Sequence, residues 1–315
     1  MSNYKTTITN IERMIMESED FAKRAKNASD ISFGSFGCME ASDARKYASD
    51  AHYYANRANS ELSTIVAEYN REVKALVGEI NDMIDELNLV NDNIANMQHK
   101  VDEKELIAQI REIDIQAGTD WYKEVGSKKV APLRKQLSTL SKEVTVSKKH
   151  EKEKLETNNV FRNTSSDLEK VRVYSDYAEN YAKRADYEYS ESEKKCQLQR
   201  CYDESLYAER RADDALYSFR REVSNLETNM GKLENKRSDI KNELNKAKYK
   251  ESNMVQKEQL MDYKLDLLNV KREIEAKKQQ LSSIYEKAGT TWYKEVGSKQ
   301  AKQLRLEINQ MEKRR

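Results

Sequence analysis

The sequence predicts an all-α protein: an elongated antiparallel coiled-coil rod of about five helices, three of them very long, built from two tandem repeats. The chain of 315 residues contains one proline and eight glycines, so few positions force a helix to stop. Apolar residues recur at alternating spacings of three and four over long stretches, as in a coiled-coil seam. The string WYKEVGSK occurs at residues 121–128 and again at 292–299, which indicates an internal duplication.

The first predicted helix is short and is followed by a loop. Its seam residues follow the three-and-four spacing of a helix packed on a partner, and they are Ile8, Ile11, Ile15, Ser18, Ala22 and Ala25. Glycines and serines between Ser29 and Gly37 mark the loop that reverses the chain.

The second predicted helix runs from Met39 to about Ala117, roughly 120 Å at the helical rise. It opens with six successive seam alanines, which allow a neighbouring helix to approach closely. Two steps of four follow each other from Ile65 through Tyr69 to Val73, and this stutter locally unwinds a left-handed supercoil. The seam residues are Ala41, Ala44, Ala48, Ala51, Ala55, Ala58, Leu62, Ile65, Tyr69, Val73, Leu76, Ile80, Met83, Leu87, Val90, Ile94 and Met97.

The second repeat follows the same plan. A long third helix is expected from Ser127 to Gln197, and its segment 168–185 reproduces segment 8–25 at an offset of 160. After a turn near Cys196 to Cys201, a fourth helix carries a seam from Ser205 to Leu268, and a fifth runs from Lys299 to Arg315. We therefore divide the chain into a first repeat at 1–155 and a second at 156–315, which form one continuous rod.

Two similar corners interrupt the long helices. Gly118 or Gly289 can end the incoming helix, and the tryptophans and tyrosines follow directly. Two interpretations stay open: a hydrophobic plug that closes a thin bundle, or a partner-binding knob, because Trp and Tyr are common interface anchors.

The segment lengths predict projecting ends. The chain from Arg221 to Trp292 is 21 residues longer than the chain from Arg71 to Trp121, and counting residues up and down the rod places the two Arg-Glu-Val segments side by side. Each end then becomes a two-helix overhang with a partly exposed apolar stripe, and heterologous contacts between such ends generate open filaments. The candidate partner-binding residues at corners and ends are Trp121, Tyr122, Trp292, Tyr293, Phe33, Phe36, Leu304 and Ile308.

Charge and composition argue against several classes of partner. The 56 basic and 55 acidic residues cancel and are interleaved, so we expect no strong field for nucleic acid or an anionic bilayer. The first sixteen residues lack the features of a secretory signal. We expect a cytoplasmic protein.

No catalytic motif stands out. The sequence contains no glycine-rich phosphate loop, no zinc-protease motif and no nucleophile elbow. The cysteines Cys38, Cys196 and Cys201 are expected to be free buried or boundary thiols, and His52, His99 and His150 are too scattered to form a site by spacing. We expect no enzyme, cofactor or metal.

The sequence thus predicts a structural protein whose subunits assemble with themselves into a filament or scaffold, with other proteins as possible partners at the corners. Two alternatives stay open. One is a membrane-acting helical rod, such as a curvature scaffold or a toxin-like protein. The other is a spacer or adaptor for other proteins.

Overall fold

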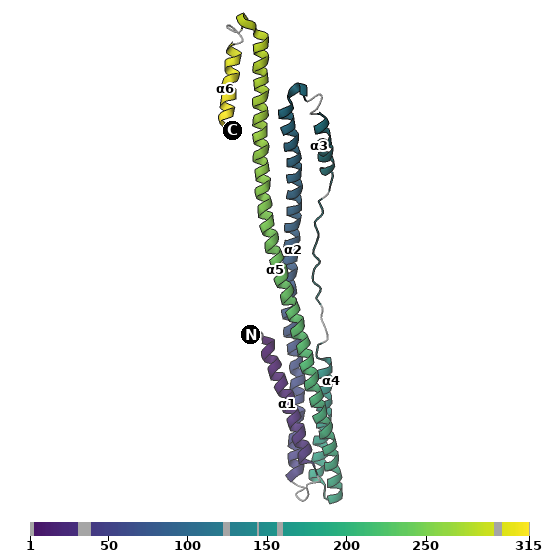
Figure 1. The fold of residues 1–315 in the computed structure, drawn as a ribbon. Coiled ribbons are helices and arrows are strands. Elements are labelled where there is room, and N and C mark those ends of the chain that lie inside the picture. The colour runs from purple at the N-terminus through teal and green to yellow at the C-terminus, as the bar shows by residue number, and fades with distance from the viewer. Residues whose placement is uncertain are drawn as a thin grey trace. The chain divides into compact units, whose positions relative to one another are not determined.

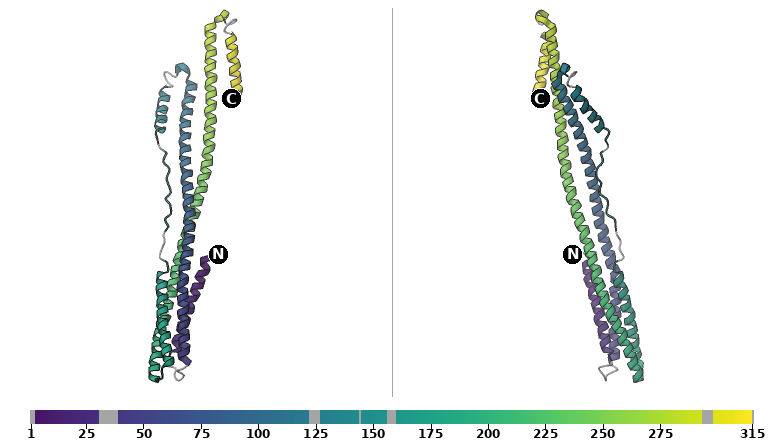
Figure 2. Two further views of the ribbon diagram at one scale, coloured as in Figure 1. Left: turned by 180° about the vertical axis from the view of Figure 1, so that it is seen from behind. Right: turned by 45° about the vertical axis from the view of Figure 1, so that its right-hand side comes forward.

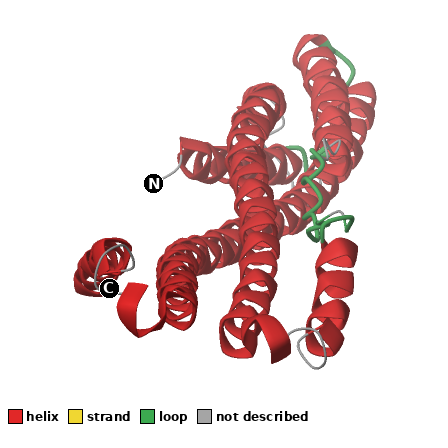
Figure 3. Cartoon of the chain, turned by 90° about the horizontal axis from the view of Figure 1, so that it is seen from above, coloured by secondary structure: helices red, strands yellow, loops and turns green. Residues whose placement is uncertain are grey.

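The computed structural model describes residues 3–30, 39–121, 127–143, 145–155, 160–292 and 298–314. Nearly all of these residues are helical and none lies in a strand, which confirms the all-α class (Figure 3). The helices are α1 (Asn3–Ala28), α2 (Met39–Trp121), α3 (Ser127–Leu140), α4 (Arg162–Tyr187), α5 (Glu191–Trp292) and α6 (Ser298–Arg314) (Figure 1).

The predicted continuous helix from Ser127 to Gln197 is wrong. The chain leaves the helical conformation after α3, and α4 begins only at Arg162. Residues 147–154 read SKKHEKEK and contain no apolar side chain. A helix over this segment has no face to bury, and most helical stability in proteins comes from such burial.

The chain forms two compact units, each built from both halves of the sequence. Unit 1 comprises residues 1–81 and 153–239, and unit 2 comprises residues 82–152 and 240–315. Because each unit draws on both halves, this division does not test the proposed repeats at 1–155 and 156–315.

Unit 1 is a bundle of α1, α4 and the first parts of α2 and α5, which lie side by side in every view (Figure 2). Its core is an alanine seam, as the sequence predicted: the seam residues of α4 are all buried, and so are the six alanines that open α2. The Ser18 hydroxyl donates a hydrogen bond of 2.9 Å to the Ala51 carbonyl. Such contacts require closely spaced backbones.

Aromatic rings flank this narrow seam. The Phe21 ring stacks on Tyr54 at 5.4 Å between centroids and on Tyr47 at 6.4 Å. Phe161 precedes α4 in a left-handed conformation with φ of 67°, and its buried ring stacks on Phe219. The rings therefore supply the volume that the alanines lack.

The expected overhang of α1 and α2 is wrong. The turn between α4 and α5 lies at residues 188–190 and not near Cys196 to Cys201. α5 therefore begins earlier in the chain than expected. Ala41 in the first turn of α2 packs against Ala185 and Leu198. The first described turns of α2 are thus covered by α4 and α5.

In unit 2 the second parts of α2 and α5 pair in parallel. Ion pairs join Glu86 to Lys248 and Glu112 to Lys264, so residue numbers rise together along both helices. Between them lies a narrow seam of α2 residues Leu87, Val90, Ile94, Val101 and Ala108 and α5 residues Leu244, Ala247, Met254, Met261 and Leu268.

The parallel arrangement of α2 and α5 agrees with the prediction made by counting residues along the rod. The register between the two helices differs from the predicted one. Alignment of the two Arg-Glu-Val segments requires an offset of 150, whereas in unit 1 the Arg237 guanidinium contacts Glu79 at an offset of 158. The residue count assumed a helix through 141–161 and a later turn before α5, and both assumptions are wrong.

Candidate interaction surfaces

Among the described residues of unit 2, α6 is the helix that accompanies the last part of α5. The seam with α2 extends to Leu268 of α5, whereas Lys278 forms an ion pair of 3.1 Å with Glu312 of α6. Nearer the end of α5, the Arg305 guanidinium of α6 lies 5.4 Å from the Tyr285 ring centroid. The two helices are therefore antiparallel, and Figure 1 shows α6 beside the last turns of α5.

This α5–α6 pair has a thin core. Ile274 on α5 and Ala301 and Ile308 on α6 are buried. Other apolar side chains of the pair are only half-buried, namely Leu281, Ile284, Leu304 and Met311, and Leu306 is 55% exposed. A helix pair without a third neighbour leaves part of its apolar surface in water.

Two of the eight candidate partner-binding residues lie in this pair. Leu304 is half-buried and Ile308 is buried against α5, so Ile308 packs within the chain. Trp121 and Trp292 are the last residues of α2 and α5. Their side chains lie outside the described part of the chain, as do Tyr122, Tyr293, Phe33 and Phe36.

A second surface, which sequence reasoning missed, is the polar face of α2 that holds the connection after α3. We call residues 145–152 the strap; it runs beside α2 in unit 2 (Figures 1 and 2). Asn88 pairs with the strap backbone twice: its amide nitrogen donates to the His150 carbonyl at 3.1 Å, and its oxygen accepts from the His150 amide at 2.8 Å.

Four further α2 side chains extend this contact in both directions. Asp85 pairs with Lys152 at 2.7 Å, and Asn96 accepts a hydrogen bond of 2.6 Å from the Thr145 hydroxyl. The remaining two contacts join Asp92 to the Ser147 hydroxyl and the His99 ring to the Leu140 carbonyl at the end of α3.

The strap is held by polar contacts and runs antiparallel to α2. From Asp85 to Asn96, eleven residues advance α2 by about 16 Å, and seven strap residues cover the same distance at about 2.4 Å each. The strap is therefore more extended than a helix but short of a full strand. Its one described aliphatic side chain, Val146, is exposed, so the strap adds nothing to the apolar core.

In unit 1, a second asparagine side chain of α2, that of Asn81, pairs with the backbone of one residue. The Asn81 side chain accepts a hydrogen bond of 2.7 Å from the Glu153 amide and donates one of 3.2 Å to the Glu153 carbonyl. Asn81 and Asn88 are seven residues apart. Amides at heptad spacing beside an apolar seam were the available sequence signal.

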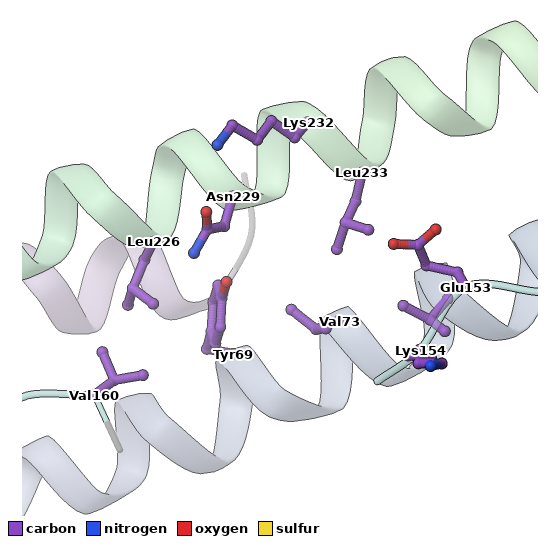
Figure 4. Close-up of a pocket in the computed structure, with 10 residues that line it drawn as sticks. Tyr69, Val73, Glu153, Lys154, Val160, Leu226, Asn229, Lys232 and Leu233 are labelled. Carbon is purple, nitrogen blue, oxygen red and sulfur yellow. The ribbon is translucent and has the colours of Figure 1, made fainter. Parts of the chain in front are cut away.

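A cavity of about 280 Å³ in unit 1 lies at the predicted stutter (Figure 4). The Tyr69 ring stands between α2 and α5, and Leu226 and Leu233 of α5 lie on either side of it. Burial raises the pKa of Tyr69, and a hydrogen bond from Asn229 offsets part of this rise. No cysteine, histidine or serine is among the described residues that line the cavity; we assign it to imperfect packing at the stutter.

The thiols and histidines do not converge. Cys201 is buried in the alanine seam, Cys196 is exposed, and both are free; Cys38 lies outside the described residues. Among the described residues no group of three or more His, Cys, Asp or Glu side chains is placed to hold a metal ion. None of the described helices is both long and apolar enough to cross a bilayer.

Comparisons with known proteins give no relative. No family model, no curated protein and no solved structure shows significant similarity to this chain.

Proposed function

We propose that the protein is a non-enzymatic structural protein, an elongated coiled-coil subunit of two tandem repeats that assembles with copies of itself. The observation that carries the proposal is the α5–α6 pair of unit 2, in which α5 continues past its seam with α2 and has α6 as its neighbour in the described part of the chain. Its half-buried apolar side chains are typical of an incomplete bundle.

The lengths and spacing of the long helices also support this function. α2 has 83 residues and α5 has 102, and both bury a stripe and not a whole circumference. A protein built from such helices is long but buries little apolar surface in its core. Contacts between subunits would add the burial that a thin core lacks.

The direct test is sedimentation velocity across a wide range of concentrations, with electron microscopy of the same samples. We expect the sedimentation coefficient of the wild-type protein to rise with concentration. Leu306→Glu should weaken this association, because Leu306 is an exposed apolar residue of the α5–α6 pair and a charge there must be desolvated at any contact.

A matched control is Leu89→Glu, because Leu89 is similarly exposed, at 61%, but lies on α2. This variant should assemble like the wild type. A wild-type protein that stays monomeric at the highest concentration contradicts self-assembly and favours the spacer alternative.

A further inference from the structure

The balanced total of charge conceals an uneven distribution between the two units. Unit 1 contains 26 basic and 31 acidic residues, whereas unit 2 contains 30 basic and 24 acidic residues. Residues 127–152, which include α3 and the strap, contain eight basic and two acidic residues. The rest of unit 2 is therefore balanced, and its whole excess of positive charge lies in this one segment.

The basic side chains of this segment form an exposed surface beside α2. α3 carries four of them and no acidic residue. α3 and the strap follow one another along α2, on the side away from α5 (Figures 1 and 2). We call six exposed side chains of this surface the basic face: Lys128, Lys129, Arg134, Lys142, Lys148 and Lys149.

Most of the basic face is not neutralised by the chain itself. In the described part of the chain, no ion pair to a carboxylate is formed by four of its lysines, namely Lys128, Lys142, Lys148 and Lys149. Asp85 and Asp92 of α2, beside the strap, already contact Lys152 and Ser147. The positive charge of the face is therefore available to a partner.

The hollow beside the basic face is acidic. A groove of about 650 Å³ separates α2 from α3, and Asp102, Glu105 and Glu143 line it together with Lys135. A nucleic-acid strand placed in this groove would bring its phosphates against three carboxylates, which repel them. The basic face is thus a ridge without a basic groove, and a ridge suits a flat anionic surface.

The side chains within the segment also favour lipid over nucleic acid. Residues 127–152 contain no aromatic residue, so they provide no platform on which bases could stack. Val146 lies between Lys142 and Lys148 in the sequence and is 86% exposed. A bilayer can bury an apolar side chain at the level of its headgroups while lysines contact anionic lipids, whereas a phosphate backbone offers no apolar site.

We propose that the basic face is a docking site for the surface of an anionic lipid bilayer. Clusters of about four to eight Lys and Arg residues are attracted to anionic headgroups, and the basic face has six such residues. This mode of binding is peripheral and needs no helix that crosses the bilayer. The site goes beyond self-assembly and does not depend on it.

The test is flotation of the full chain with lipid vesicles, at concentrations where the chain alone sediments as a monomer. Vesicles of phosphatidylcholine are compared with vesicles of equal parts phosphatidylcholine and phosphatidylserine. We expect the chain to float with the mixed vesicles only. Binding should be lost in 1 M salt, where the Debye length falls to about 3 Å.

Matched variants locate the binding on the chain. Lys148→Gln combined with Lys149→Gln should weaken binding to the mixed vesicles roughly 25-fold, since each lysine near an anionic surface contributes a factor of about five. The control combines Lys241→Gln with Lys250→Gln, which removes two exposed lysines of α5 in the same unit. This control should bind like the wild type.

Several results would overturn the proposal. They are equal binding to both kinds of vesicle, no binding, or an equal loss in the control variant. Release of the chain from mixed vesicles by duplex DNA at the same concentration of anionic charge would reassign the face to nucleic acid. Loss of self-association in the Lys148→Gln, Lys149→Gln variant, measured without lipid, would reassign it to contacts between copies. Self-association of the wild type is measured separately by sedimentation, so failure of either proposal leaves the other intact.

Discussion

The alanine seam of unit 1 makes a sharp prediction for Ala182→Leu. Ala182 packs with Ala25, Ala44, Ala48, Ala178 and Cys201, all essentially inaccessible to solvent. With room for the three added carbons, burial would stabilise the fold by about 2.4 kcal/mol at about 0.8 kcal/mol per carbon. The packing around Ala182 decides whether this substitution stabilises or destabilises the fold.

We expect destabilisation of about 3 kcal/mol, at the upper end of the range for overpacked cores. The surrounding alanines have no side-chain rotamers through which to move aside. Separation of the helices would relieve the clash, but it would pull Ala25, Ala44 and Ala48 out of contact. A loss of this size corresponds to a fall of about 6–12 °C in melting temperature for a unit of this length.

The measurement is urea and thermal unfolding followed by circular dichroism. Ala247→Leu is the matched control, because Ala247 lies in the α2–α5 seam of unit 2 among Leu87, Leu244 and Met254. This seam is open at its sides, so the added carbons can extend outward, and the change should stay within about 1 kcal/mol. If Ala182→Leu were neutral or stabilising, the close helix spacing that we infer would be refuted.

Three further predictions concern the strap and Cys201. Asn88→Ala should accelerate amide exchange of His150 at least tenfold with little change in global stability, whereas Asn93→Ala, which loses a contact to Glu251, should not affect the strap. Burial raises the pKa of Cys201 to about 11 from 9.0, so its stabilising effect is complete below pH 9 and is lost as pH rises through 11. The stability of the wild type relative to Cys201→Ala should fall by about 3 kcal/mol across this window, as urea titrations can measure. Co-expressed fragments 1–148 and 149–315 should copurify, because each core joins both halves of the chain; independent elution contradicts this.

The seam residues were predictable because burial along a long helix leaves a clear periodic signal. Leu168, Val171, Ser175, Ala178, Ala182 and Ala185 are all buried in α4, as the repeat of segment 8–25 indicated. Several predicted seam residues are only half-buried, among them Ile8, Met97 and Leu265. Met83 is half-buried while Ile84 is buried, and Val223 is half-buried where the helices pass the stutter.

The connection between α3 and α4 was not predictable from apolar spacing, because its contacts are polar. A charged helix and a solvated extended segment have similar sequences when neither contains an apolar residue, as in residues 147–154. The informative residues lay elsewhere, in the amides of Asn81 and Asn88 on α2.

The length difference between the two halves of the chain and the packing of α5 first on α2 and then on α6 have a common physical explanation. The chain from Arg221 to Trp292 exceeds the chain from Arg71 to Trp121 by 21 residues, which is three heptads and therefore preserves the direction of a seam. This extra length lets α5 continue past α2, where burial needs a new partner, and α6 supplies it. In the described part of unit 2, Leu260, Tyr263 and Leu267 precede the part of α5 that α6 accompanies, and these three side chains are exposed.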